Sequence, residues 1–360
     1  AYAGPADFNA AAALDPDLLR SGAIIAAMLV SVLTVWASAR LAERVAGRAA
    51  GPWVALAVAL DPNFIRHSLV ISPDMLLTLF VVLGLIAALE VLEQGTLRAS
   101  LLGGLWLGLG TACKYSPALL VAPLLVAHAL RPGGRRGIAV LRDVQLWLAA
   151  LVALAAFIAA TPYTVIDFVR RWSDVLVATD ALMGGSAGGT RQFAALFYLR
   201  DLLPADLGWP LFVLLLGGVG GSLVRRTPER MVILAFVLPY AVMFGLVATP
   251  FTRYLLPVLP PALALTAGVG RELLTRFSAR RWLMAAGLVA LLGLSVQSAR
   301  FMEEYLRPES RAIARDWFVK HVPDGAVVAA EHTGPPIPER AARTAALSMS
   351  GVSERWRRTG

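Results

Sequence analysis

Charged residues and cysteine are both scarce in this 360-residue sequence. Only 16% of the residues are Asp, Glu, Lys or Arg, against about 25% in a typical soluble protein. Cys113 is the only cysteine, which excludes an intrachain disulfide. No HExxH, P-loop, GxSxG or CxxC motif is present, so the common signatures of zinc peptidases, P-loop proteins, serine hydrolases and thiol redox proteins are missing.

Apolar residues, in contrast, make up 58% of the sequence. Several windows of 17–22 residues carry no charge, which is long enough to cross a hydrocarbon core of about 30 Å. We therefore predict an all-α polytopic membrane protein and, despite a net charge of +9, no nucleic-acid partner. About ten transmembrane helices are expected, at 20–39, 50–66, 74–92, 99–112, 116–130, 144–160, 207–224, 231–249, 254–270 and 282–298.

Basic residues are unevenly distributed over the loops between these runs. Alternate short loops are rich in arginine, whereas the opposite short loops carry only Arg66, Lys114 and Arg253. Because basic loops stay in the cytoplasm, we predict a multi-pass plasma membrane protein, in a bacterial inner membrane, whose site faces the periplasm or exterior. The segments expected outside are 1–18, 61–73, 112–117, 161–205, 250–253 and 299–360.

The C-terminal part differs in composition from the rest. Residues 1–298 are expected to form the transmembrane module, and the polar residues 299–360 an extracytoplasmic segment that begins a small α/β domain. A helix is predicted over 308–320, a turn at Pro323–Gly325 and a strand over 326–331. Since the sequence starts at Ala1 and stops within a polar stretch, we expect a fragment or a processed chain.

One lysine, Lys114, interrupts an apolar stretch that extends from Leu101 to Leu130. It lies in "CKYSP", where Pro117 can open a second helix. Such a lysine can snorkel to the headgroups, or it can pair with an anion at a functional site. We predict that it binds a lipid phosphate, helped by the following helix N-terminus and by the hydroxyl group of Tyr115.

Asp74 follows an outer loop that also contains Arg66 and His67. In "SPDMLLTLF", Ser72 and Pro73 precede the acid and form a good helix start on capping grounds alone. A carboxylate near an imidazole could also support acid–base chemistry or hold a divalent cation. Both interpretations stay open, and no metal ligand or other cofactor is assigned.

The stretch "FTRYLLPVLPP" places Arg253 and Tyr254 at the outer ends of two spans. Arg253 could anchor the chain at the interface, or it could bind a phosphate with two hydrogen bonds, which arginine does better than lysine. Charged loop surface is the simpler interpretation of Asp167, of 170–171 and of His332. Small residues recur at helical spacing in "GGLWLGLG" (103–110) and predict close helix packing.

These motifs occur in a characteristic order. "RLAERVAGRAAGPWVALAVALDPNFIRHSLVISPDMLLTLF" is followed by "LLGGLWLGLGTACKYSPALLVAPLL", "TPYTVIDF", "GGSAGGT", "FTRYLLPVLPPALALTAG" and "ESRAIARDWFVKHVPDGAVVAAE". The series, over about residues 20–331, resembles the polyprenyl-phosphate-sugar-dependent glycosyltransferases of the GT-C superfamily, the protein O-mannosyltransferases and lipid A aminoarabinose transferases (glycosyltransferase family 39-like).

The resemblance implies a GT-C-type helix bundle and a glycosyltransferase that moves a hexosyl or pentosyl group. The donor would be a polyprenyl-phosphate sugar in the membrane lipids, the acceptor a protein, lipid or glycan, and the anomeric carbon would be inverted. Lys114 matches the family's lysine, with a role at the donor phosphate. Asp74 matches the acid after the family's "H-S" loop and is the candidate catalytic residue, while Arg253 and Tyr254 match an "RY-x-x-P" element. Tyr115, His67 and Arg66 are the other substrate-binding candidates.

The sequence departs from the family at its start. The family carries an acidic residue, often an Asp-Glu pair, in the first outer loop, and Asp7, Asp15 and Asp17 do not form that motif. We therefore expect the main catalytic base upstream of Ala1, with an inactive chain as the alternative. Two other classes stay open: a transporter or flippase of a lipid-linked substrate, which broken helices also suit, and a non-catalytic membrane scaffold.

Overall fold

The computed structural model describes residues 16–168, 172–173, 176, 194–247, 250–276, 280–307, 310–323, 326–330 and 342–346. By its internal contacts the chain divides into two compact units, Ala1–Ser298 and Ala299–Gly360. The predictions for Asp7, Asp15, 170–171, "GGSAGGT" and His332 lie outside the described residues, as does the side chain of Asp17.

The first unit is helical throughout its described part, and its helices follow the predicted apolar runs. The first half comprises α2 (Pro16–Ala46), α3 (Ala50–Ala59), α4 (Pro62–Ser68), α5 (Asp74–Gln94), α6 (Leu97–Cys113), η1 (Ser116–Leu120), α7 (Val121–Leu130), η2 (Gly137–Arg142), α8 (Val144–Ala160) and α9 (Pro162–Ile166). The second half comprises α11 (Ala194–Phe197), the π-helical η3 (Tyr198–Leu202), α12 (Leu203–Val224), α13 (Pro228–Gly245), η4 (Thr252–Leu255), α14 (Leu259–Arg276) and most of α15 (Arg280–Tyr305).

The second unit contains the end of α15, then α16 (Ser310–His321) and two strands, β1 (Ala326–Ala330) and β2 (Ala342–Ala346). Helix α16 corresponds to the helix predicted over 308–320, and β1 to the strand predicted over 326–331. The two strands pair in parallel, with Ala326 opposite Ala342.

Among the described residues, five helices are long and apolar enough to cross a membrane. They are Ser21–Ala46, Asp74–Gln94, Ala194–Val224, Pro228–Gly245 and Met284–Tyr305. Shorter apolar helices cover Ala50–Ala59, Leu97–Cys113, Ser116–Leu130 and Val144–Ala160. The chain is therefore a multi-pass, all-helical membrane protein in its first unit, while the predicted number of about ten spans stays a prediction.

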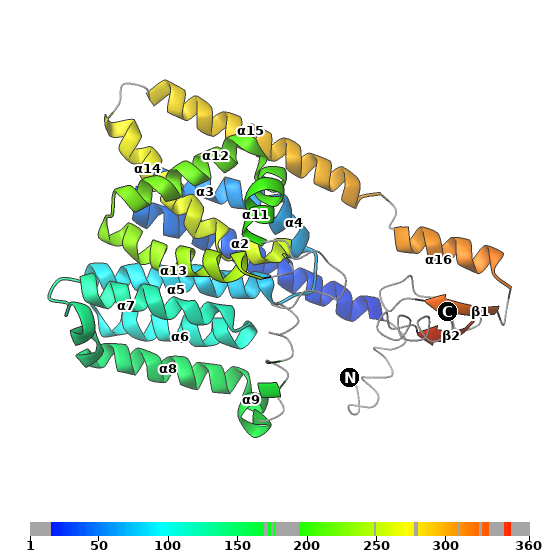
Figure 1. Cartoon of the computed structure of the whole chain (residues 1–360), viewed down its shortest axis with the longest axis horizontal. Coiled ribbons are helices and arrows are strands. Elements are labelled where there is room, and N and C mark those ends of the chain that lie inside the picture. The colour runs from blue at the N-terminus through cyan, green and yellow to red at the C-terminus, as the bar shows by residue number, and fades with distance from the viewer. Residues whose placement is uncertain are drawn as a thin grey trace, which may run out of the picture. The chain divides into compact units, whose positions relative to one another are not determined.

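Helix α5 is the centre of the first unit. In its spanning window 72% of the residues are buried, against 17% in α2, so α5 is the helix that is surrounded by protein. It packs against α2 and α6, α6 packs in turn against α8, and α2 packs against α3 and α14 (Figure 1). A helix that is apolar all round fits such a central place.

The predicted run 50–66 is divided into α3 and α4. Asp61 adopts an extended backbone conformation (φ −71°, ψ 123°) and its side chain accepts a hydrogen bond from the Phe64 amide. The residue before a proline disfavours helical angles, and Pro62 follows Asp61 at the first helical position. Asp61 therefore ends one helix and caps the next.

The break predicted around Lys114 is present. Helix α6 ends at Cys113, and Lys114 is extended (φ −166°, ψ 150°). The 3₁₀-helix η1, with Pro117 in its first turn, then leads into α7. Because each short helix packs against its neighbours, the polar groups freed by the break can be satisfied within protein.

Close packing of α6 on α8 confirms the interpretation of "GGLWLGLG". A Cβ atom on Gly104 would lie 2.1 Å from the Ala149 carbonyl oxygen, and one on Gly108 would lie 2.2 Å from that of Ala153. Backbone cannot move aside as a flexible side chain can, so only glycine fits these two positions.

Gly104→Ala is therefore expected to force α6 and α8 apart and to lower the free energy of unfolding by about 1–3 kcal/mol. Thermal or denaturant unfolding of the detergent-solubilised protein measures this loss. The control is Gly220→Ala on α12, where the added methyl group meets nothing within 4 Å. Equal stability of the two variants would contradict the close contact.

Candidate functional site

Lys114 and Asp74 form an ion pair between the end of α6 and the start of α5. Lys114 Nζ donates to Asp74 Oδ1 at 3.1 Å, and the Ser72 hydroxyl group donates to Asp74 Oδ2 at 2.9 Å. The Ser72 oxygen also accepts from the Asp74 amide, although α5 begins at Asp74 with Pro73 at the N-cap position, one residue later than predicted. The side chain of Asp74 is 7% exposed and that of Lys114 is 34% exposed. The ammonium group is thus paired with a buried protein anion, while about a third of the lysine side chain is exposed.

Tyr254 and Arg253 lie beside this pair. Lys114 Nζ is 4.8 Å from the centroid of the Tyr254 ring, and the Arg253 guanidinium carbon is 5.7 Å from the same centroid. Arg253 also lies over the Phe251 ring at 4.3 Å. Two cations therefore share one aromatic ring, which attracts both through its π face. Arg253 Nε is buried and has no hydrogen-bond partner among the residues described.

His67 and Arg66 belong to the same region through α4. His67 is buried, and its Nδ1 lies 2.8 Å from the Asn63 carbonyl oxygen. A carbonyl oxygen only accepts, so Nδ1 carries the proton and Nε2 keeps its lone pair in the neutral ring. Burial lowers the pKa of His67, and the charges of Asp74, Arg66 and Arg253 also act on it. The structure thus brings six of the seven predicted site residues into one neighbourhood. Tyr115, the seventh, is next to Lys114 in the chain and about half exposed.

Sequence reasoning missed the polar residues that surround this group. Asn63 donates from Nδ2 to the Thr252 carbonyl oxygen at 2.8 Å, and Tyr198 bonds to the backbone of Phe251. Asp206 has a buried Oδ2 without a partner in the described part of the chain. It precedes a kink at Gly208, whose φ of +71° favours glycine. A π-helix before a kinked helix often marks a functional site, but neither feature has a clear sequence signature.

Asp61 is a further buried acid in this region. Its side chain is 1% exposed. Burial, and after it the Asp206 carboxylate, raise the pKa of Asp61 to about 8, although the backbone amides of Phe64 and Asn63 act in the opposite direction. The Asp-Pro pair in "DPNF" is a sequence signal for the capping role of Asp61. The burial of Asp61 depends on tertiary contacts and has no such signal.

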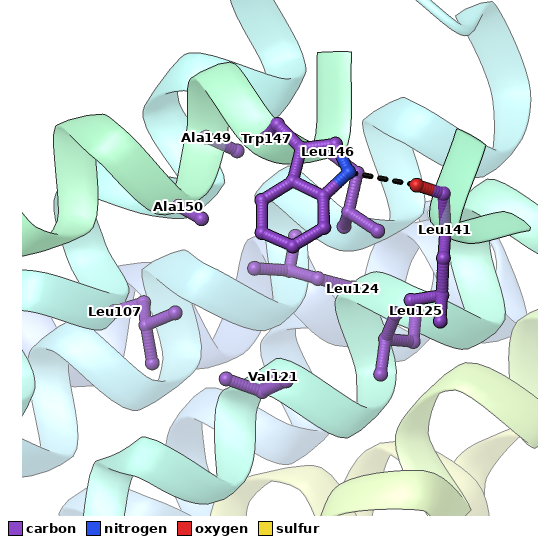
Figure 2. A pocket seen from close by; sticks show the side chains of 9 residues that line it. All are labelled: Leu107, Val121, Leu124, Leu125, Leu141, Leu146, Trp147, Ala149 and Ala150. Atoms are coloured by element: carbon purple, nitrogen blue, oxygen red, sulfur yellow. Dashed lines mark hydrogen bonds between the residues drawn. The ribbon is translucent and has the colours of Figure 1, made fainter. Parts of the chain in front are cut away.

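One apolar hollow in the unit lies away from these polar residues. It has a volume of about 200 Å³ and lies between α6, α7 and the start of α8 (Figure 2). Its lining is apolar and consists of Leu107, Val121, Leu124, Leu125, Leu141, Leu146, Trp147, Ala149 and Ala150. It contains none of the predicted site residues, so it does not support acid–base chemistry. In the described ranges no three His, Cys, Asp or Glu side chains gather into a metal site.

Part of the sequence matches the model of a known family. Residues 17–163 match the family model of dolichyl-phosphate-mannose-protein mannosyltransferases. The predicted resemblance to the GT-C glycosyltransferases is confirmed. The matched segment contains Asp74 and Lys114 but ends well before Arg253. No curated protein sequence matches the chain.

Solved GT-C structures share the fold. ArnT from Cupriavidus metallidurans bound to undecaprenyl phosphate is 16% identical over 87% of this chain and 69% of its own, with a TM-score of 0.61. The same enzyme in the apo state is 20% identical over 74% of this chain and 47% of its own, with a TM-score of 0.50. The apo oligosaccharyltransferase of Archaeoglobus fulgidus is 15% identical over 85% of this chain and 48% of its own, with a TM-score of 0.50. This chain thus spans about half the length of two of these relatives.

Asp61 predicts a distinct dependence of stability on pH. Its pKa in the folded protein, about 8, is above the ordinary value of 3.8, so the fold favours the protonated form. The contribution of Asp61 to stability is therefore fully present below about pH 4 and is lost as the pH rises to about 8. Asp61→Asn keeps the cap but cannot ionise, so its stability relative to wild type should rise by several kcal/mol between pH 4 and pH 8.

Unfolding of the two proteins in detergent at a series of pH values measures this difference. Asp316→Asn, at an exposed position of α16, is the control and should follow the wild type throughout. A constant difference between Asp61→Asn and wild type across this range would show that Asp61 is ionised in the folded protein.

Proposed function

We propose that this chain belongs to a membrane glycosyltransferase that transfers a sugar from a polyprenyl-phosphate-linked donor to an acceptor, with inversion, on the outer side of the membrane. The observation that carries the proposal is the position of Lys114, at a helix break, with both Asp74 and the Tyr254 ring next to its ammonium group and Arg253 near the same ring. The family match over 17–163 and the shared GT-C fold support it.

In this proposal the donor phosphate binds between Lys114 and Arg253. A lipid donor cannot leave the bilayer, so cations are needed at the depth of its phosphate, where an arginine can give two parallel hydrogen bonds and a lysine a point charge. Lys114, Arg253 and Asp74 together carry one net positive charge. The phosphodiester of the donor carries one negative charge, so the bound state is close to neutral.

The same cations then stabilise the leaving group. When the bond between the anomeric carbon and the phosphate oxygen breaks, the phosphate gains a second negative charge. Cations that are already in place stabilise that developing charge without reorganisation. The acceptor hydroxyl oxygen forms the new bond to the anomeric carbon, and its proton goes to a base.

We assign Asp74 to hold Lys114 in place during this reaction. Both of its carboxylate oxygens already accept hydrogen bonds, from Lys114 and from Ser72, and its side chain is almost fully buried. The acceptor's proton is therefore taken by another group. His67 and Arg66 lie close enough to tune the charge of the site.

The proposal includes the arrangement in the membrane. The arginine-rich loops face the cytoplasm, about ten helices span the bilayer, and the second unit, 299–360, begins an extracytoplasmic α/β domain. The break at Lys114 then lies at the outer leaflet of a plasma membrane, which we take to be a bacterial inner membrane. The acceptor, a protein, lipid or glycan, approaches from that side.

Lys114→Met is expected to reduce sugar transfer by a hundredfold or more, since it removes one preorganised charge from the leaving group (about 10²–10³ for such a donor). Transfer is measured with the full-length protein in lipid nanodiscs and a panel of radiolabelled polyprenyl-phosphate sugars. Lys320→Met, at an exposed position of α16, is the matched control and should keep full activity.

Wild-type turnover in Lys114→Met would overturn the assignment of the phosphate site. Movement of an intact lipid-linked sugar across the membrane by the wild type, without cleavage of the sugar–phosphate bond, would instead support a transporter. Binding of an outer-side partner with neither activity would support a scaffold.

A further inference from the structure

The turn that carries Arg253 and Tyr254 has little structure of its own. This turn, 251–254, consists of Phe251 in an extended conformation (φ −126°, ψ 141°) and the first three residues of the four-residue 3₁₀-helix η4, which no side chain caps. Such short helices are weakly held by their own hydrogen bonds. Interactions with other elements must therefore fix the position of these two side chains.

Tyr198 holds the first residue of this turn. Its hydroxyl group donates to the Phe251 carbonyl oxygen at 3.2 Å and accepts from the Phe251 amide at 3.0 Å. One side chain thus satisfies both backbone groups of one residue. Tyr198 is 6% exposed and begins the π-helix η3, so the hydroxyl group that makes both bonds comes from a side chain packed within the unit.

Asn63 holds the next residue. Its Nδ2 donates to the Thr252 carbonyl oxygen at 2.8 Å, and its side chain is buried in the first turn of α4. Consecutive residues of the turn are therefore bonded to two side chains that come from different parts of the chain. Buried hydrogen bonds of this kind are costly to break, because the partners then stay unsatisfied.

Arg253, which lies in this turn, has a ring contact but leaves one hydrogen-bond donor without a partner among the described residues. Its guanidinium group lies over the Phe251 ring at 4.3 Å, while its buried Nε has no hydrogen-bond partner in the part of the chain that the structure describes. Tyr254 is in turn packed on Phe244, with ring centroids 4.3 Å apart. An arginine that is fixed by its backbone and its ring contact, with a donor to spare, is prepared to bind an anion.

We propose that Tyr198 and Asn63 are positioning residues, which hold the 251–254 turn so that Arg253 and Tyr254 face the donor phosphate together with Lys114. The inference rests on the proposed function, since it assigns these two residues to the phosphate site of that reaction. Neither residue touches the phosphate. They act by removing the entropy cost of ordering the turn when the anion binds.

Binding of a short-chain polyprenyl phosphate to the full-length protein in nanodiscs tests the inference, with the matching polyprenol as the probe that lacks the phosphate. Tyr198→Phe keeps the ring and removes the hydroxyl group. It should weaken binding of the phosphate about tenfold, a typical loss for a misplaced charged hydrogen bond, and leave binding of the alcohol unchanged. Asn63→Ala should show the same selective loss.

Tyr305→Phe, at a half-exposed ring on α15, is the matched control and should bind both probes as the wild type does. A merely structural role of Tyr198 would weaken binding of the phosphate and of the alcohol equally, and that result would overturn the proposal. So would wild-type binding of the phosphate by both Tyr198→Phe and Asn63→Ala.

Sugar transfer is measured on the same samples. Selective loss of phosphate binding in a wild type that transfers no sugar would refute the glycosyltransferase and keep the positioning role. Full transfer in the wild type, with unchanged phosphate binding in both variants, would support the glycosyltransferase and refute the positioning role of Tyr198 and Asn63.

Discussion

The ion pair between Lys114 and Asp74 is the interaction on which the arrangement of the candidate site depends. An unpaired ammonium group at membrane depth is expensive, so the chain must supply an anion or a path to the headgroups. Here the anion is Asp74, which opens the central helix α5 and is itself oriented by Ser72. Because Asp74 is buried and Lys114 is partly exposed, the pair fixes the lysine while part of its side chain stays accessible.

The position of Lys114 depends on how α6, which ends beside it, packs against α8. Gly104 and Gly108 bring α6 against α8, and a polar network ties their far ends together. There His128 Nδ1 lies 2.9 Å from Asp143, His128 Nε2 lies 3.4 Å from the Ser100 hydroxyl group, and Arg131 donates to Asp143 at 2.6 Å. Serine, histidine and aspartate in this order resemble a hydrolase triad. Ser100 and His128 are both 0% exposed, however, so no substrate reaches them and the network is structural.

The helices and the break at Lys114 could be predicted from the sequence, because hydropathy, proline and the basic residues of loops are signals that lie within short stretches of the chain. The apolar run 50–66 was extended past Asp61 although the outer segment was expected to begin at residue 61, and the short helix α4 that follows Asp61 was not predicted. The partner of Lys114 was expected to be a lipid phosphate, whereas the structure supplies Asp74, 40 residues earlier in the chain. Asn63 and Thr252 are 189 residues apart, and no local pattern connects them. Side-chain contacts of this range depend on packing and have no periodicity to detect.

Charge balance gives the last constraint on the proposed reaction. Before transfer, one net positive charge on Lys114, Arg253 and Asp74 faces a singly charged phosphodiester. After cleavage the phosphate carries two negative charges, and the acceptor has lost a proton. If Asp74 took that proton, its bond from Lys114 would weaken just as the lysine is needed most, because a neutral carboxylic acid holds an ammonium group less strongly. A separate base leaves the pair intact. In the proposed reaction one residue therefore takes the proton of the acceptor, and other residues stabilise the phosphate that leaves. Because Asp74 is not the base in this proposal, it can be buried, whereas a base must lie within hydrogen-bond distance of the acceptor.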